Sequence, residues 1–97
     1  MAQLRLALAQ VDVTVGDIAG NVDLVMRWTR HGVERGAHVV AFLEMALTGY
    51  PVEDLALRPS FVAASRAAAD ELARRLAADG LGDAVVIVGY LDRYPSA

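Results

Sequence analysis

Two residue types are missing from the sequence, which has 97 residues but neither cysteine nor lysine. Without cysteine, these residues can build no disulfide framework and offer no thiol nucleophile. Without lysine they offer no amine nucleophile and no P-loop lysine, and all nine basic residues are arginines. The chain by itself is therefore excluded from thiol-based and lysine-based chemistry.

Long apolar runs and excess positive charge are also absent. No apolar segment approaches the length that spans a bilayer, and Met1–Arg5 lacks the pattern of a signal peptide. The net charge of -3 predicts no general attraction to nucleic acid or to anionic membranes. We therefore expect a cytoplasmic protein whose partners include neither nucleic acid nor membrane.

Apolar residues make up 56% of the chain, which indicates a packed core in one small domain. Their spacing alternates between the strand period and the helix period. Strands are predicted at Leu4–Val11, His38–Leu43 and Ala84–Tyr90, and helices from Val22 to a stop at Gly36 and from Pro59 to Asp79. Asn21 is the expected N-cap of the first helix. This βαβαβ order predicts right-handed crossovers and a parallel sheet, and hence an α/β fold.

The predicted sheet needs more cover than these helices supply. Its strands are apolar on both faces, as in sheets that are buried on both sides, yet only two helices accompany three strands. The sequence also stops just after the third strand, before a further helix. We therefore interpret residues 1–97 as the opening part of a larger domain.

Glu44 is the candidate functional residue, because it directly follows the buried apolar run Val39–Leu43. Open α/β sheets place ligands and catalytic groups at the carboxyl ends of their parallel strands. A carboxylate at that position is suited to act as a general base. The alternative is structural, with Glu44 marking the point at which the strand reaches water.

Other polar segments have simpler explanations. The loop Gly16–Asn21 joins a strand to a helix, but its spacing matches neither the dinucleotide fingerprint nor a P-loop, so we interpret it as a turn and a cap. A small α/β module that binds a phosphorylated ligand through this loop is an alternative of another functional class. His31 and His38 lack partners at metal-site spacing, and Glu53–Asp54 fits turn chemistry. No metal or cofactor site is expected in this segment.

The residues around Glu44 resemble a known signature. Phe42–Tyr50 reads Phe-Leu-Glu-Met-Ala-Leu-Thr-Gly-Tyr. This is similar to the first signature of the nitrilase, or carbon–nitrogen hydrolase, superfamily, in which a strand ends in Phe-Pro-Glu and Thr-Gly-Tyr follows. Leu6–Gln10 and Val86–Tyr90 resemble that family's first and third strands, so the resemblance covers nearly the whole chain. Leu43 departs from the pattern, because the family usually has a proline there that fixes the turn aiming the glutamate.

Within the superfamily, Tyr50–Leu55 most resembles the amino-terminal glutaminase domain of glutamine-dependent NAD synthetases, where the loop reads Gly-Tyr-Pro-x-Glu-Asp-Leu. The resemblance implies that residues 1–97 are the βαβαβ opening portion of a nitrilase-like four-layer αββα sandwich. The remainder of that carbon–nitrogen hydrolase domain and any synthetase domain would lie outside this sequence. Such domains pair across subunits, which implies a homo-oligomer. The alternative is another amidase of the superfamily, with a different amide or nitrile substrate and no synthetase domain.

The family's mechanism gives roles to two residues of this chain. Glu44 matches the glutamate that takes the proton of a catalytic cysteine, and Tyr50 matches a tyrosine in the wall of the glutamine pocket. In the family the cysteine attacks the amide and a lysine stabilises the oxyanion. Neither is present in these 97 residues, so the chain alone should be inactive. The released ammonia would serve the ATP- and magnesium-dependent amidation of nicotinic acid adenine dinucleotide to NAD in the absent synthetase domain.

Overall fold

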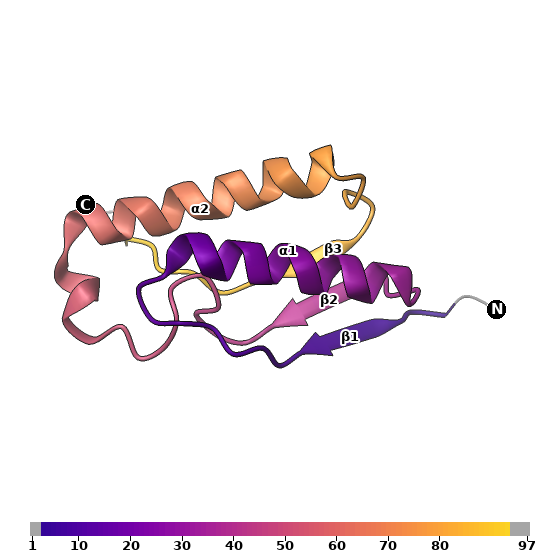
Figure 1. Ribbon diagram of the computed structural model, residues 1–97, viewed down its shortest axis with the longest axis horizontal. Helices are drawn as coiled ribbons and strands as arrows, with labels where there is room; N and C mark the ends of the chain where they lie inside the picture. Colours follow the sequence, from indigo (N-terminus) through magenta and orange to yellow (C-terminus); the bar gives the residue numbers. More distant parts are fainter. Residues whose placement is uncertain (1–2, 94–97) are drawn as a thin grey trace.

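The computed structural model describes residues 3–93 and contains two long helices and a small sheet (Figure 1). In chain order the elements are β1 (Leu6–Ala9), α1 (Ile18–Glu34), β2 (Val39–Phe42), the short 3₁₀ helix η1 (Glu53–Leu57), α2 (Pro59–Ala78) and β3 (Val85–Ile87). Strands alternate with long helices as the periodicity predicted, so the α/β class is confirmed.

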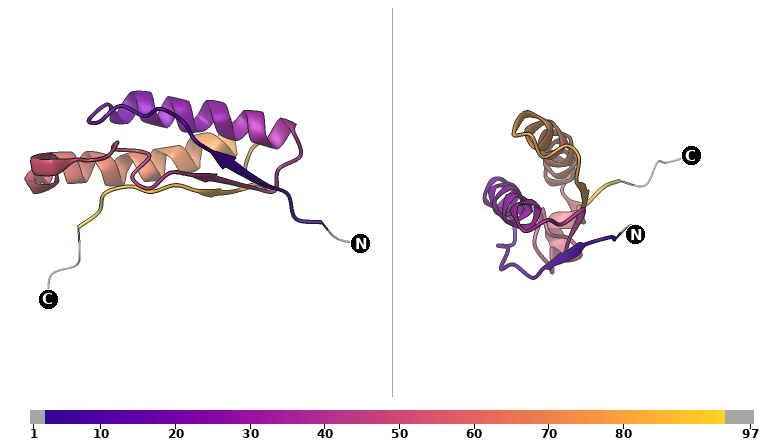
Figure 2. Two further views of the ribbon diagram at one scale, coloured as in Figure 1. Left: turned by 90° about the horizontal axis from the view of Figure 1, so that it is seen from below. Right: turned by 90° about the vertical axis from the view of Figure 1, so that its right-hand side faces the viewer.

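The three strands are parallel and lie in the order β1-β2-β3. Leu6 pairs with Val39, and Val39 pairs with Val85, so the register is continuous across the sheet. Two crossovers of the same hand that step in the same direction place their helices on the same side of a sheet. Accordingly, α1 and α2 lie together over one face (Figure 2).

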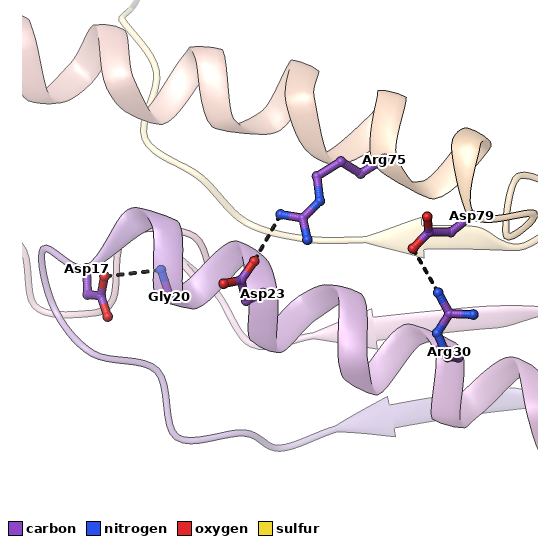
Figure 3. A network of polar contacts seen from close by, with 6 residues as sticks. All are labelled: Asp17, Gly20, Asp23, Arg30, Arg75 and Asp79. Atoms are coloured by element: carbon purple, nitrogen blue, oxygen red, sulfur yellow. Dashed lines mark hydrogen bonds and ion pairs between the residues drawn. The ribbon is translucent and has the colours of Figure 1, made fainter.

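An apolar layer fills the space between the helices and the sheet. Its buried members come from both helices, from the turn after β2 and from the segment after α2: Val22, Val25, Met26, Leu47, Ala68, Leu72, Leu76 and Leu81. Along each helix they recur every three or four positions, the spacing that gathers side chains on one helical face. Exposed ion pairs join the two helices beside this layer, Arg75 to Asp23 at 3.0 Å and Arg30 to Asp79 at 2.8 Å (Figure 3).

The start of α1 differs from the prediction. The helix begins at Ile18 rather than Val22, and its N-cap is Asp17, whose carboxylate accepts a hydrogen bond from the Gly20 N–H at 3.1 Å (Figure 3). Asn21 was therefore wrongly assigned as the cap. Both residue types cap helices well, and Asp17 comes first after the left-handed turn residue Gly16, whose φ is 84°.

Both helices end in the same way. Gly36 after α1 and Gly80 after α2 are left-handed, with φ of 87° and 76°. The next N–H in each case donates back into the last turn, from Ala37 to Gly32 at 3.0 Å and from Leu81 to Leu76 at 2.8 Å. This is the Schellman arrangement, which satisfies carbonyls that the helix leaves free. Neither α1 nor α2 combines the length and apolar composition that a bilayer-spanning helix requires.

The face of the sheet opposite the helices is apolar and bare among residues 3–93. Leu6, Leu8, Val85 and Ile87 lie on it and are between 55% and 73% exposed, whereas Val40, on the helix side, is fully buried. Burial of apolar surface is favourable by roughly 25 cal/mol per Å², so covering this face would stabilise the fold. The sequence predicted that two helices cannot cover both faces of the sheet, and in residues 3–93 they cover one face only (Figure 2).

The third strand is shorter than the predicted Ala84–Tyr90 segment. Its ladder with β2 ends at Ile87, and the Gly89 C=O instead accepts a hydrogen bond from the Leu47 N–H at 3.1 Å. Leu47 belongs to the turn that follows β2. The chain therefore leaves the ladder because the turn after β2 takes over as its hydrogen-bond partner.

Candidate functional site

Glu44 opens a tight turn at the carboxyl end of β2, where the sequence placed the candidate site. Phe42 is the last strand residue, and the turn covers residues 44–48. Within it the Met45 C=O accepts from the N–H groups of Thr48 and Gly49, at 3.2 and 2.8 Å. Met45 is left-handed, with φ of 59°. That conformation costs a residue with a side chain about 1–2 kcal/mol, and it persists only where the surroundings hold it in place.

Two neighbouring segments hold the turn from opposite sides. On one side, the Gly16 N–H donates to the Thr48 C=O at 2.9 Å, and a Cβ on Gly49 would lie 2.5 Å from the Val15 Cα. On the other side, Gly89 packs so closely that a Cβ there would collide with the Met45 nitrogen. Glycine at position 89 thus lets two backbones meet beside Glu44.

The two residues with predicted roles are both accessible. Glu44 is exposed, and Tyr50 keeps 71% of its surface in water. Within residues 3–93, neither side chain takes part in a hydrogen bond or ion pair with another residue. The Tyr50–Pro51 peptide bond is cis. Leu43 is 46% exposed, so its side chain adds little to the core. The carboxylate and the phenol are both available to a ligand.

Other candidates from the sequence have structural roles. The Asp17 carboxylate already accepts from the Gly20 N–H in the first turn of α1, where a phosphate would bind, so the Gly16–Asn21 segment is a turn and a cap, as interpreted. Glu53 and Asp54 open η1. The His38 Nδ1 accepts from the Arg5 N–H at 2.9 Å. Within residues 3–93, no three His, Asp or Glu side chains come together as a metal site.

A groove of about 540 Å³ runs between β1 and α1, away from the turn. Arg5, Leu8, Trp28 and His31 are among the residues that line it, and Glu44 and Tyr50 are not. The His31 ring meets Trp28 edge to face, with the ring centroids 5.2 Å apart. This groove lies along the outer strand of the sheet and is separate from the candidate site.

Sequence reasoning missed two residues that contact the turn. Asn21 is buried, and its Nδ2 donates to the Leu47 C=O at 3.1 Å. Its place four residues before Val25 on the apolar face of the helix was a signal that its side chain points inward. Gly89 inside an otherwise apolar run was the corresponding signal of a close backbone approach.

Comparison with curated proteins finds one kind of enzyme. The sequence is 45% identical over 71 residues to the glutamine-dependent NAD(+) synthetase of Xylella fastidiosa, a stretch that makes up 72% of this chain and 13% of that protein. It is 36% identical over 92 residues to the synthetase of Thermotoga maritima, or 95% of this chain and 16% of that protein. This chain is homologous to glutamine-dependent NAD(+) synthetases. No family model matches the sequence.

Solved structures of glutamine-dependent NAD(+) synthetases share the fold. The Acinetobacter baumannii enzyme, in complex with adenosine diphosphate, superposes with a TM-score of 0.78 at 26% identity, over 97% of this chain and 17% of that chain. The Cytophaga hutchinsonii enzyme gives a TM-score of 0.70 at 24% identity, over 74% of this chain and 12% of that chain, which shows the fold alone. The chain thus spans less than a fifth of the length of these synthetases.

Proposed function

We propose that residues 1–97 are the N-terminal part of the glutaminase domain of a glutamine-dependent NAD synthetase, with Glu44 as its general base. The observation that carries the proposal is the place of Glu44. The carboxylate opens a strained turn, held from both sides, at the carboxyl end of the central strand of a sheet shared with synthetases. A structural charge at a strand end would need no such support.

In the proposed reaction Glu44 removes the thiol proton of a cysteine, and the resulting thiolate attacks the carboxamide carbon of glutamine. Glu44 gives this proton to the leaving nitrogen, which departs as ammonia. The carboxylate then takes a proton from the water that attacks the thioester and returns it to the departing thiolate, so that product glutamate and free thiol are formed. Tyr50 forms part of the glutamine pocket. Since the chain contains no cysteine and no lysine, the nucleophile and the oxyanion-stabilising lysine come from outside these residues.

The complete protein would use the ammonia in a second domain, where ATP and magnesium drive the amidation of nicotinic acid adenine dinucleotide to NAD. The segment described here supplies no cofactor ligand in this proposal. Its own contribution is the base and one wall of the glutamine pocket, so residues 1–97 alone should not hydrolyse glutamine. We also propose that the complete protein acts in the cytoplasm, as a homo-oligomer formed by pairing of the glutaminase domains.

The bare sheet face supports a sandwich of which this chain forms only a part. A second sheet packed on Leu6, Leu8, Val85 and Ile87 would bury their side chains, as inner faces do in layered folds. With α1 and α2 outside, the layers would then read helix, sheet, sheet, helix. This is the nitrilase-like αββα architecture.

The test is Glu44→Gln in the full-length protein, which keeps the size of the side chain and removes its basicity. NAD synthesis is measured with glutamine and, separately, with ammonium chloride as the nitrogen source. We expect glutamine-driven synthesis to be lost and ammonia-driven synthesis to be unchanged. Glu71→Gln, the same change on the exposed face of α2, is the matched control and should alter neither activity.

Equal loss of both activities in Glu44→Gln would refute the role of Glu44. A full-length protein that hydrolyses an amide but makes no NAD from either nitrogen source would instead point to the amidase alternative, with the base assignment intact.

A further inference from the structure

The buried Asn21 carboxamide makes hydrogen bonds through both its oxygen and its nitrogen. Its side chain is 1% exposed. The Oδ1 atom accepts from the Thr14 N–H at 2.9 Å, and Nδ2 donates to the Thr14 C=O at 2.8 Å and to the Leu47 C=O at 3.1 Å. The helix does not need Asn21 as a cap, because Asp17 serves there. Its three bonds instead join the loop after β1 to the turn that follows Glu44.

Both backbone polar groups of Leu47 are hydrogen-bonded, one to Gly89 and the other to Asn21. Its N–H donates to the Gly89 C=O at 3.1 Å, and its C=O accepts from Asn21. Leu47 itself is fully buried, so neither group has water as a substitute partner. Between Leu47 and Glu44 there are only two residues, and one of them is the left-handed Met45. The position of the Glu44 backbone therefore depends on the position of Leu47.

We propose that Asn21 is a positioning residue that aims the Glu44 carboxylate by clamping Leu47 against the loop after β1. The inference rests on the proposed role of Glu44 as the base. Asn21 touches neither substrate nor reacting atoms in this scheme. It acts through the turn, because its bond to the Leu47 carbonyl is one of the contacts that hold the left-handed conformation of Met45.

An amide suits this task better than an apolar side chain of similar size. A leucine at position 21 would leave the buried Leu47 C=O and the part-buried Thr14 N–H without these partners, while the Thr14 C=O would keep only its bond from the Asp17 N–H, at 3.1 Å. The turn would then relax to find other partners, and Glu44 would move with it. A displacement of about 1 Å in a catalytic group can lower a rate by about 100-fold.

The test uses Asn21→Asp and Asn21→Ser in the full-length protein. Aspartate keeps the shape but removes both donors, and serine is too short to reach from α1 to Leu47. Thr29→Val is the matched control, since Thr29 is fully buried on the same helix face and does not bond to the turn. For each variant kcat and KM for glutamine are measured, together with ammonia-driven synthesis, at a temperature where circular dichroism shows the protein folded.

We expect the Asn21 variants to lose about 100-fold in kcat for glutamine, with KM changed by less than about threefold, because the pocket stays while the base is misaligned. Ammonia-driven synthesis and Thr29→Val should match the parent protein. A merely structural role would not split kcat from KM in folded protein.

The inference would be overturned if the folded Asn21 variants turned over glutamine as fast as Thr29→Val. It would also be overturned if both Asn21 variants failed to fold, since Asn21 would then hold the fold rather than aim the base. Glu44→Gln, measured alongside, separates the two proposals. If Glu44→Gln keeps glutamine turnover, the proposed function fails; if only the Asn21 variants keep it, the positioning role alone fails.

Discussion

Gly89, just beyond the end of β3, packs directly against the peptide that joins Glu44 to Met45. A Cβ at position 89 would collide with the Met45 nitrogen and would lie 3.3 Å from the Glu44 Cα and 3.2 Å from its carbonyl carbon. Since these atoms are backbone, they cannot rotate away as a flexible side chain would. The segments that follow β2 and β3 are therefore in direct backbone contact beyond the last paired residues of the two strands. This contact lies at the proposed base.

Gly89→Ala should destabilise the protein and impair glutamine hydrolysis. Forcing one methyl group into this contact must shift the turn, and overpacking of this kind costs about 1–3 kcal/mol. Chemical denaturation of the full-length protein measures the first effect, and glutamine-driven NAD synthesis measures the second. Gly82→Ala is the control, because a Cβ there would meet only the Ala77 Cα, at an ordinary 3.7 Å. Equal stability of the two variants would show that the close contact is not rigid.

Thr29→Val should stabilise the protein by about 1 kcal/mol. The Thr29 Oγ1 is buried in α1 and has no hydrogen-bond partner among residues 3–93, while valine has the same shape and a similar helix propensity. Ser65→Ala provides the contrast, since the fully buried Ser65 Oγ accepts from the Leu91 N–H at 2.9 Å. Its loss should cost about 1–2 kcal/mol. Urea denaturation compares the two, and destabilisation by Thr29→Val would mean that the hydroxyl has a partner in solution.

Leu8→Asp tests whether the bare sheet face is covered in the full-length protein. Leu8 is 73% exposed here, so a charge would be harmless if the face stays in water. If a second sheet packs on it, an unpaired buried carboxylate should cost about 3 kcal/mol or more. Thermal unfolding and the yield of soluble protein report the difference. Ala73→Asp, on the exposed side of α2, should cost less than about 1 kcal/mol. Similar melting of the two variants would argue against the sandwich.

The ion pairs between α1 and α2 should add little stability. Arg30 and Asp79 are 2.8 Å apart, but their side chains are 48% and 43% exposed, so water screens the attraction. A double-mutant cycle with Arg30→Ala and Asp79→Ala should give a coupling free energy below about 1 kcal/mol, smaller still in high salt. A coupling several times larger would mean that these residues organise the helix pair, a role that we assign to the apolar layer.

Much of the fold was predictable because it is set by local chemistry. The alternation of strand and helix follows from the apolar periods, and the helix ends at Gly36 and Gly80 follow from the left-handed conformation that glycine adopts without strain. The position of Glu44 at a strand end was equally predictable, because an apolar run directly precedes it in the sequence. The bare face was foreseen from strands that are apolar on both sides.

The roles of Asn21 and Gly89 could not be read in the same way. The place of Asn21 on the apolar face of α1 indicates that its side chain points inward, but it does not say which groups the amide binds. Folding decides that, by bringing Thr14 and Leu47 within reach of the Asn21 amide. Gly89 lies forty residues or more from the peptide that it contacts. The sequence by itself determined the elements and the position of the proposed base, because these depend on neighbours along the chain. Only the tertiary structure decided what holds that base in place, because those hydrogen bonds and close contacts join segments that are distant in sequence.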